Sequence, residues 1–317
     1  MIVLDDARVL DLVDQGGIVT ALKRAFIEPA QTPSRMHCAL PGDDEAKLLI
    51  MPSWSGRSAI GVKIVTVIPS NRERGRPTID GAYILMDGKS GQPLAILNGP
   101  VLTGLRTAGV CALAASVLSR TDTKTLLMIG TGALAPYLVR AYMAVRNLER
   151  VIIWGRDSQK GRDLADTLSA LPVEFEVAHD LSSALHRADL VCSATLTRSP
   201  LVAGARIAPG AHVDLVGSFT PEMREADTEL FRRGRLVVDT MTAFDESGDI
   251  IEPLRERVIS RSVPDLAQLL REPTLGRASA EEITIFKSVG TGIADLGVAR
   301  YVLDRYEAKT LTDGTRG

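Results

Sequence analysis

Residues 130–135 of this 317-residue chain have the types and spacing of a phosphate-binding turn. An apolar run at 125–129 ends at Gly130, and Gly132 and Ala135 complete a glycine-x-glycine-x-x-alanine pattern before a helical segment. The first glycine permits a tight turn, the second lets the backbone approach a pyrophosphate, and the small third residue lets helix and strand pack. Free N–H groups at the helix start favour bound phosphate. The motif therefore predicts a dinucleotide site formed by Gly130, Thr131, Gly132, Ala133 and Leu134.

Lys63 interrupts a strand-like run in which both faces are apolar, with Val65 and Val67 on its own face. A lysine buried there is costly unless it pairs with an anion or takes part in chemistry. The alternative is a lysine at the strand edge whose ammonium group reaches solvent. Because both faces of the run are apolar, the pattern favours a functional Lys63.

Two arginines are further candidates for chemistry. Arg106 shares a helix face with Leu102 and Val110. It could be a structural ion-pair partner or a bidentate clamp for a substrate carboxylate, and its position alone leaves both open. Arg35 is weaker evidence by itself, because most arginines are solvated surface charges.

The residues after the second strand of the dinucleotide motif bear on cofactor choice. Sites specific for NAD place an acid at the end of this strand to bind the ribose hydroxyls. Here Gly155 takes that place, and Arg156 is positioned to meet the 2′-phosphate of NADP. Alternatively Arg156 is solvated and Asp157 or Ser158 caps the next helix, or Asp157 binds the ribose of NAD. The sequence favours NADP, with NAD possible.

The chain around these residues has two regions that differ in their pattern of predicted helices and strands. A helical segment at 5–28 precedes consecutive strand-like runs, which predict an antiparallel sheet, and a small-residue helix at 102–118 follows. After residue 120 strands and helices alternate, which predicts a doubly wound parallel sheet. The predicted strands are 47–51, 59–68, 81–86, 93–98, 125–129, 151–154, 173–177, 189–193, 212–216 and 235–239.

The predicted fold class is α/β: a Rossmann-type doubly wound parallel sheet with a second α+β substrate domain. The final helix near 292–306 has apolar residues at helical spacing and is expected to return to the first domain. The expected domains are therefore 1–120 with 293–317, for substrate, and 121–292, for the dinucleotide.

Composition excludes several classes of function. A net charge of −2 and 4% aromatic residues argue against nucleic acids and anionic membranes as partners. The four histidines lack metal-ligand spacing, so no metal site is expected. The three scattered cysteines and the absence of a signal-peptide pattern indicate reduced thiols in a cytoplasmic protein.

With Lys63, Arg106 and the glycine turn in this order, the chain resembles the ornithine cyclodeaminase/mu-crystallin family from about residue 35 to 300. The resemblance is carried by five segments: GVKIVTVIPSN (61–71), TGLRTAGVCALAASVLSR (103–120), GTGALAPY (130–137), GAHVDLVGSFTPEMRE (210–225) and FKSVGTGIADL (286–296). It implies a homodimer built on the first domain, a nicotinamide cofactor on the second, and an amino or imino acid as substrate.

The resemblance also implies roles for individual residues. Arg35, Lys63 and Arg106 would surround the substrate carboxylate. Ser218 and Ser288 would lie near the nicotinamide end of the cofactor, and Thr195 along its groove. Gly217 would be a further cofactor-binding residue. Cyclodeaminases of the family have an aspartate at the position that Phe219 occupies here.

This departure favours one reaction of the family. Cyclodeamination needs a carboxylate for the amine protons, which phenylalanine cannot supply. Asp214 or Glu222 could substitute, although the first is expected inside a strand and the second in an exposed loop. Reduction of a cyclic ketimine carboxylate needs fewer groups, with Lys63 as proton donor or electrostatic orienter, Arg35 and Arg106 as carboxylate clamp, and Phe219 as an apolar wall.

Other functions remain open at this point. Within the family they are ornithine cyclodeamination and an oxidoreductase reaction on an amino acid, as in alanine dehydrogenases. A protein that only holds NADPH is the non-enzymatic alternative. A generic Rossmann dehydrogenase would instead use Lys63 and Arg106 in structural ion pairs with protein acids.

Overall fold

The computed structural model describes residues 1–41, 46–56 and 58–314. Contacts between Cα atoms divide the chain into two compact units. Unit 1 comprises 1–106 with 291–317, and unit 2 comprises 107–290. The division falls within helix α3 (Gly99–Leu118), whereas the boundary expected from the sequence, residue 120, follows the end of this helix.

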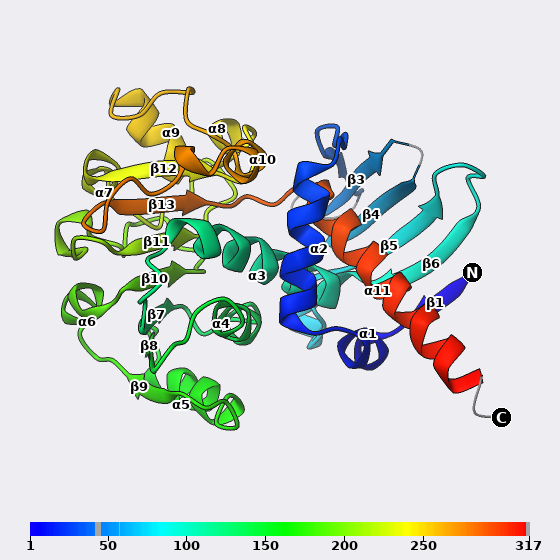
Figure 1. Ribbon diagram of the computed structural model, residues 1–317, viewed down its shortest axis with the longest axis horizontal. Helices are drawn as coiled ribbons and strands as arrows, with labels where there is room; N and C mark the ends of the chain where they lie inside the picture. Colours follow the sequence, from blue (N-terminus) through cyan, green and yellow to red (C-terminus); the bar gives the residue numbers. More distant parts are fainter. Residues whose placement is uncertain (42–45, 57, 315–317) are drawn as a thin grey trace. The chain divides into compact units, whose positions relative to one another are not determined.

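Unit 1 is a six-stranded sheet with helices on one face (Figure 1). The order β1-β6-β5-β4-β3-β2 is antiparallel, as predicted, except that β1 pairs in parallel with β6. The sequence reading did not include the short strands β1 and β2. The elements are β1 (Ile2–Leu4), α1 (Asp6–Leu12), α2 (Gln15–Ile27), β2 (Met36–Ala39), β3 (Lys47–Ser55), β4 (Ala59–Val67), the 3-10 helix η1 (Pro69–Arg74), β5 (Ile79–Asp87), β6 (Pro93–Asn98) and α11 (Gly292–Gly314).

Strand β4 has one buried face and one partly buried face. Ala59, Gly61, Lys63 and Val65 alternate as buried residues, while the residues between them are only partly buried. Helix α11 contacts β3, β4 and β5, so the buried side chains of β4 lie beneath this helix. The charged side chain of Lys63 is therefore enclosed between sheet and helix.

Unit 2 is a seven-stranded, wholly parallel sheet in the order β12-β13-β11-β10-β7-β8-β9, which confirms the predicted doubly wound sheet (Figure 1). The sequence reading missed β13, a fully buried strand between β11 and β12. The strands are β7 (Thr125–Ile129), β8 (Arg150–Trp154), β9 (Glu174–Val177), β10 (Leu190–Ser193), β11 (His212–Leu215), β12 (Gly234–Val238) and β13 (Ile283–Lys287).

The strand order places a ligand crevice at the carboxyl ends of β7 and β10. The chain proceeds from β7 to β8 and β9 on one side, and returns through β10 to β11 on the other. Ligands of open α/β sheets bind at this reversal. The connecting helices are α4 (Ala135–Met143), α5 (Ser158–Thr167), α6 (Leu181–Arg187), η2 (Gly204–Arg206), α7 (Thr228–Arg233), α8 (Ala243–Glu246), α9 (Gly248–Arg255), α10 (Leu266–Arg271) and η3 (Pro273–Leu275).

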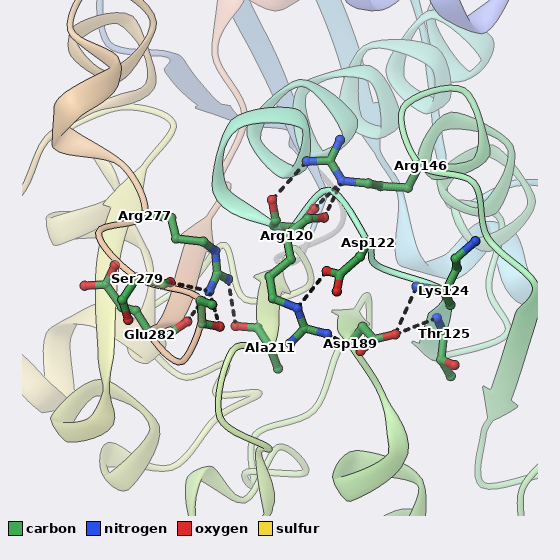
Figure 2. Close-up of polar contacts among 12 residues, drawn as sticks. Arg120, Asp122, Lys124, Thr125, Arg146, Asp189, Ala211, Arg277, Ser279 and Glu282 are labelled. Carbon is green, nitrogen blue, oxygen red and sulfur yellow. Dashed lines mark hydrogen bonds and ion pairs between the residues drawn. The ribbon is translucent and has the colours of Figure 1, made fainter.

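Helix α3 is long and apolar enough to cross a membrane, but 78% of its most apolar window is buried within the protein, as in a core helix. Two arginines of unit 2 donate hydrogen bonds to its C-terminal carbonyls. Figure 2 shows the first of them, Arg146, beside Arg120, whose carbonyl accepts from Arg146 Nε at 2.9 Å. Arg146 Nη2 donates to the carbonyls of Ala115 and Ser116 at 2.8 and 3.0 Å, and Arg277 Nε donates to that of Leu118 at 2.7 Å. These bonds fix the end of α3, because the last carbonyls of a helix have no partner within it.

Candidate functional site

Lys63 and Asp295 form a buried ion pair in unit 1. The Lys63 Nζ atom donates to Asp295 Oδ1 at 3.1 Å, and each side chain is 3% exposed. Lys63 lies at the centre of β4, and Asp295 lies in the first turn of α11, where the helix dipole favours a carboxylate. The sequence analysis missed Asp295. Its signal was available: an acid among the apolar residues Ile293, Leu296 and Ala299 of one helix.

Arg106 approaches the same carboxylate oxygen. Its Nε lies 3.3 Å from Asp295 Oδ1, and within the described residues this buried Nε has no hydrogen-bond partner. Lys63 and Arg106 thus share one oxygen of one acid, and Arg35, half-buried just before β2, acts on Lys63 electrostatically. Two cations that share one carboxylate leave net positive charge, which suits an anionic ligand.

The environment lowers the pKa of Lys63 to about 8. Burial is the main cause, because it penalises the charged ammonium form. Attraction to Asp295 raises this pKa, while repulsion from Arg106 and Arg35 lowers it. Lys63 therefore carries a proton at neutral pH and can release it far more readily than an ordinary lysine, as a general acid requires.

Tyr83 is a further polar residue that the sequence analysis missed. It pairs with Lys63 in the β4–β5 register and is fully buried. Its hydroxyl lies 3.5 Å from Ser53 Oγ, and a Cβ at Gly61 would come within 1.8 Å of it. Burial raises the pKa of Tyr83 well above its usual range, so the phenol stays neutral beside Lys63.

Unit 2 contains a cavity of about 360 Å³ at the carboxyl edge of its sheet. Gly130 has φ 109°, and a Cβ there would lie 2.6 Å from the carbonyl oxygen of Ala194. A Cβ at Gly132 would meet no atom within 4 Å, so this glycine opens onto free space. The residues fit a dinucleotide, with a turn for the pyrophosphate. The cavity is lined by Gly130, Thr131, Gly132, Trp154, Gly155, Arg156, Lys160, Ala194, Thr195, Leu196, Thr197 and Leu201.

Some predicted cofactor residues do not line this cavity. Ala133 and Leu134 form the turn that leads into α4, with Leu134 as its N-cap. Asp157 caps α5, since its Oδ1 accepts from the Gln159 N–H at 2.9 Å, and Ser158 is the first residue of that helix. The capping alternative therefore describes Asp157. Lys160, which the sequence analysis did not select, joins Arg156 in the lining.

The two serines expected near the nicotinamide have their hydroxyls engaged by the protein. Ser218 Oγ donates to the Met223 carbonyl at 2.6 Å and lies 2.8 Å from Ser247 Oγ. Ser288 Oγ donates to Asp239 Oδ2 at 2.9 Å. Both serines are buried, and their hydroxyls are bonded to protein groups. Gly217 is packed against Thr195, and Phe219 is 40% exposed.

The two acids considered as replacements for an aspartate at position 219 have other environments. Asp214 is fully buried in β11, where it accepts from Tyr142 Oη at 2.5 Å and pairs with His212 Nε2 at 3.1 Å. Glu222 is exposed at the surface. Asp214 is thus committed to an internal cluster, as its predicted place in a strand suggested.

Relatives of known sequence cover most of the chain. Protein SAR DEFICIENT 4 of Arabidopsis thaliana is 41% identical over 271 residues, 82% of this chain and 83% of that protein. The Δ1-pyrroline-2-carboxylate reductase of Paracoccus denitrificans is 37% identical over 265 residues, 82% of this chain and 84% of that protein.

Solved structures match almost the whole chain. The Thermococcus litoralis Δ1-pyrroline-2-carboxylate reductase in complex with NADH and L-proline has a TM-score of 0.91 at 30% identity, covering 98% of each chain. An archaeal alanine dehydrogenase dimer with bound NAD has a TM-score of 0.89 at 25% identity, covering 98% of this chain and 97% of that one.

The family profile gives the same assignment as these relatives and as the motifs around Lys63, Arg106 and Gly130. It matches residues 6–310, nearly the full length of the chain. The protein belongs to the ornithine cyclodeaminase/mu-crystallin family.

Proposed function

We propose that the protein is an NAD(P)H-dependent reductase of a cyclic ketimine carboxylate, such as Δ1-pyrroline-2-carboxylate or Δ1-piperideine-2-carboxylate. The observation that carries this proposal is the buried cluster of Lys63, Arg106 and Asp295, which joins a proton donor to an anion clamp. Relatives named as reductases of the first of these imines support the substrate class.

Arg106 and Arg35 bind the substrate carboxylate. The pairing of Lys63 and Arg106 with Asp295 is also what a purely structural role would give. The single carboxylate, however, does not neutralise both Lys63 and Arg106, and a substrate carboxylate would supply the missing negative charge. The planar guanidinium of Arg106 suits a bidentate contact with this carboxylate.

Lys63 supplies the proton that the imine nitrogen gains on reduction. Its lowered pKa, about 8, makes the ammonium a stronger acid than an ordinary lysine while keeping it protonated at neutral pH. Asp295 holds the ammonium in place, and the neutral phenol of Tyr83 lies in the adjacent strand. When bound, the reduced nicotinamide supplies the hydride.

The dinucleotide binds in the cavity of unit 2, with NADP preferred and NAD possible. Gly130, Thr131 and Gly132 hold the pyrophosphate, while Arg156 and Lys160 provide two cations for a 2′-phosphate. The relatives with bound NADH and NAD show that the family also accepts the cofactor without this phosphate. The preference for NADP therefore rests on the two cations alone.

Cyclodeamination is disfavoured by the acids of unit 2. Phe219 replaces the aspartate, Asp214 is held by Tyr142 and His212, and Glu222 is exposed. A carboxylate able to handle the amine protons is thus lacking among the candidates that the sequence offered.

The assembly we propose is a homodimer in the cytoplasm. The face of the unit 1 sheet opposite α11 carries partly exposed apolar side chains, including Val62, Ile64, Ile84 and Ile96, and Val3 is 65% exposed. Such a face marks an association surface, and a dimeric relative supports a second copy as its occupant. Light scattering should give a dimer for the wild type and a monomer for Ile84→Glu.

A single set of assays tests the reaction. The purified protein is mixed with NADPH and each cyclic imine, and loss of reduced-nicotinamide absorbance is followed; in parallel, L-ornithine and NAD are tested for ammonia release. The proposal expects rapid NADPH oxidation without ammonia. Ammonia and proline from ornithine would establish cyclodeamination instead, and NADPH binding without turnover of either imine would favour the binding-protein alternative.

A further inference from the structure

Glu225 is a fully buried carboxylate that the proposed reaction does not use. Its Oε1 accepts hydrogen bonds from Ser193 Oγ at 2.6 Å, Thr195 N at 2.7 Å and Thr195 Oγ1 at 2.9 Å. Its Oε2 accepts from Gly217 N at 2.6 Å. Ser193 ends β10 and Gly217 follows β11, so one side chain joins the carboxyl ends of two neighbouring strands.

The segment held by Glu225 forms part of the dinucleotide cavity. Ala194 and Thr195 both line it. On one side a Cβ at Gly130 would lie 2.6 Å from the Ala194 carbonyl oxygen, and on the other a Cβ at Gly217 would lie 1.8 Å from that of Thr195. The segment is thus packed between two glycine backbones, and a shift of Thr195 would change the space beside the phosphate-binding turn.

Buried charge surrounds Glu225. Asp249 Oδ1 accepts from the Glu225 N–H at 2.7 Å, and Asp249 Oδ2 pairs with Lys287 Nζ at 3.2 Å. All three side chains are excluded from solvent, so two carboxylates share one cation. Burial is the main reason that the pKa of Glu225 is raised to about 7; attraction to Lys287 lowers this pKa, and repulsion from Asp249 raises it. A buried net charge is costly, and such clusters gather at functional sites.

We propose that Glu225 is a positioning residue for the dinucleotide, which fixes the Ala194–Thr195 wall of the cavity through its four hydrogen bonds. The inference rests on the proposed dinucleotide site of unit 2. The ionised carboxylate offers an acceptor to every donor around it. A glutamine would direct an N–H₂ group at one of these donors, and a protonated carboxyl would lose one acceptor position.

Titration calorimetry with NADPH at pH 8 tests the role. We expect Glu225→Gln to bind NADPH about tenfold more weakly than the wild type, the effect of losing a hydrogen bond to a charged group. Glu229→Gln, the same change at a partly exposed surface residue of α7, is the matched control and should bind like the wild type.

A pH series with NADH separates positioning from a general loss of stability. NADH has no 2′-phosphate, a group that itself titrates near pH 6. Wild-type affinity for NADH should fall between pH 8 and pH 6 as Glu225 takes up a proton. Glu225→Gln cannot titrate and should show no such fall, whereas a merely structural residue would lower the unfolding temperature without changing this profile.

Three results would overturn the inference or its basis. Equal NADPH affinity of Glu225→Gln and the wild type would refute the positioning role and leave the proposed reductase intact. A wild type that binds neither NADPH nor NADH would refute the proposed function itself. Should Glu225→Gln not fold, Ser193→Ala decides: it removes one bond from a residue outside the cavity lining, and about threefold weaker NADPH binding is expected. Unchanged binding would then contradict the role.

Discussion

The Lys63 ammonium lies 3.1 Å from the Asp295 carboxylate, and the two residues are separated by 232 positions in the chain. The contact joins strand β4 to helix α11 of unit 1, and both side chains are almost inaccessible to solvent. In this pair the carboxylate holds the ammonium and favours its protonated form. Removing or altering either partner should therefore change both stability and the pH dependence of reduction.

Asp295→Asn should destabilise the protein and shift its activity profile. It leaves Lys63 and Arg106 buried without their carboxylate, and breaking such a pair costs about 3–5 kcal/mol. Because Asp295 raises the pKa of Lys63, removing the Asp295 carboxylate should lower that pKa below 8. The decline of kcat/KM with rising pH should then begin at a lower pH than in the wild type. Denaturant unfolding and kcat/KM against pH measure both effects. Asp304→Asn, an exposed change on the same helix, should alter neither.

The pH dependence of the wild type should reflect the lowered pKa of Lys63. If Lys63 is the proton donor, kcat/KM should decline as pH rises through about 8. The free energy of unfolding should instead increase between about pH 8 and the ordinary lysine pKa of 10.5, because the native state gives up its proton first. A flat activity profile over this range would exclude Lys63 as the acid.

Lys63→Met should abolish most turnover while leaving dinucleotide binding unchanged. Methionine has a similar length but no proton to donate, and loss of a general acid lowers rates by about 10²–10⁴-fold. The cavity of unit 2 does not include residue 63, so calorimetry with NADPH should give the wild-type affinity. Near wild-type turnover in Lys63→Met would mean that the proton comes from elsewhere.

Arg106→Lys should raise the KM for the imine more than it lowers kcat. The substitution keeps the charge but loses the planar fork, and hydrogen bonds to charged groups contribute about 1.5–3 kcal/mol. We expect KM to rise roughly tenfold or more. Arg24→Lys, on the largely exposed surface of α2, provides the control. An unchanged KM would remove Arg106 from the carboxylate clamp.

Arg156→Ser should reduce the preference for NADPH over NADH. Losing one of two cations near the 2′-phosphate should weaken NADPH roughly tenfold and leave NADH almost unaffected. The control is Arg162→Ser, which changes an arginine of the following helix α5 that bonds Gln159 and lies outside the cavity lining. If the substitution weakened the binding of NADPH and NADH equally, Arg156 would not be a contact of the 2′-phosphate.

The sequence by itself determined the local features of this protein. The glycine pattern at 130–135 and the alternation of strands and helices identified the parallel sheet, and the matches to known proteins confirmed the family resemblance. Lys63 was found because its charge violates a period-two apolar pattern, which depends only on neighbouring residues. The strand position of Asp214 was likewise predicted from the residues next to it.

Only the tertiary structure decided which charges meet. Asp295 and Lys63 are separated by 232 positions in the sequence, and no local pattern predicts that α11 packs on β4. The sequence around Glu225 gives no sign that this acid is buried. In the folded protein, however, its carboxylate bonds residues at the ends of β10 and β11. Long-range packing determines such partners. The free energy of burying a charged group depends on how deeply it is buried and on every group within hydrogen-bond distance.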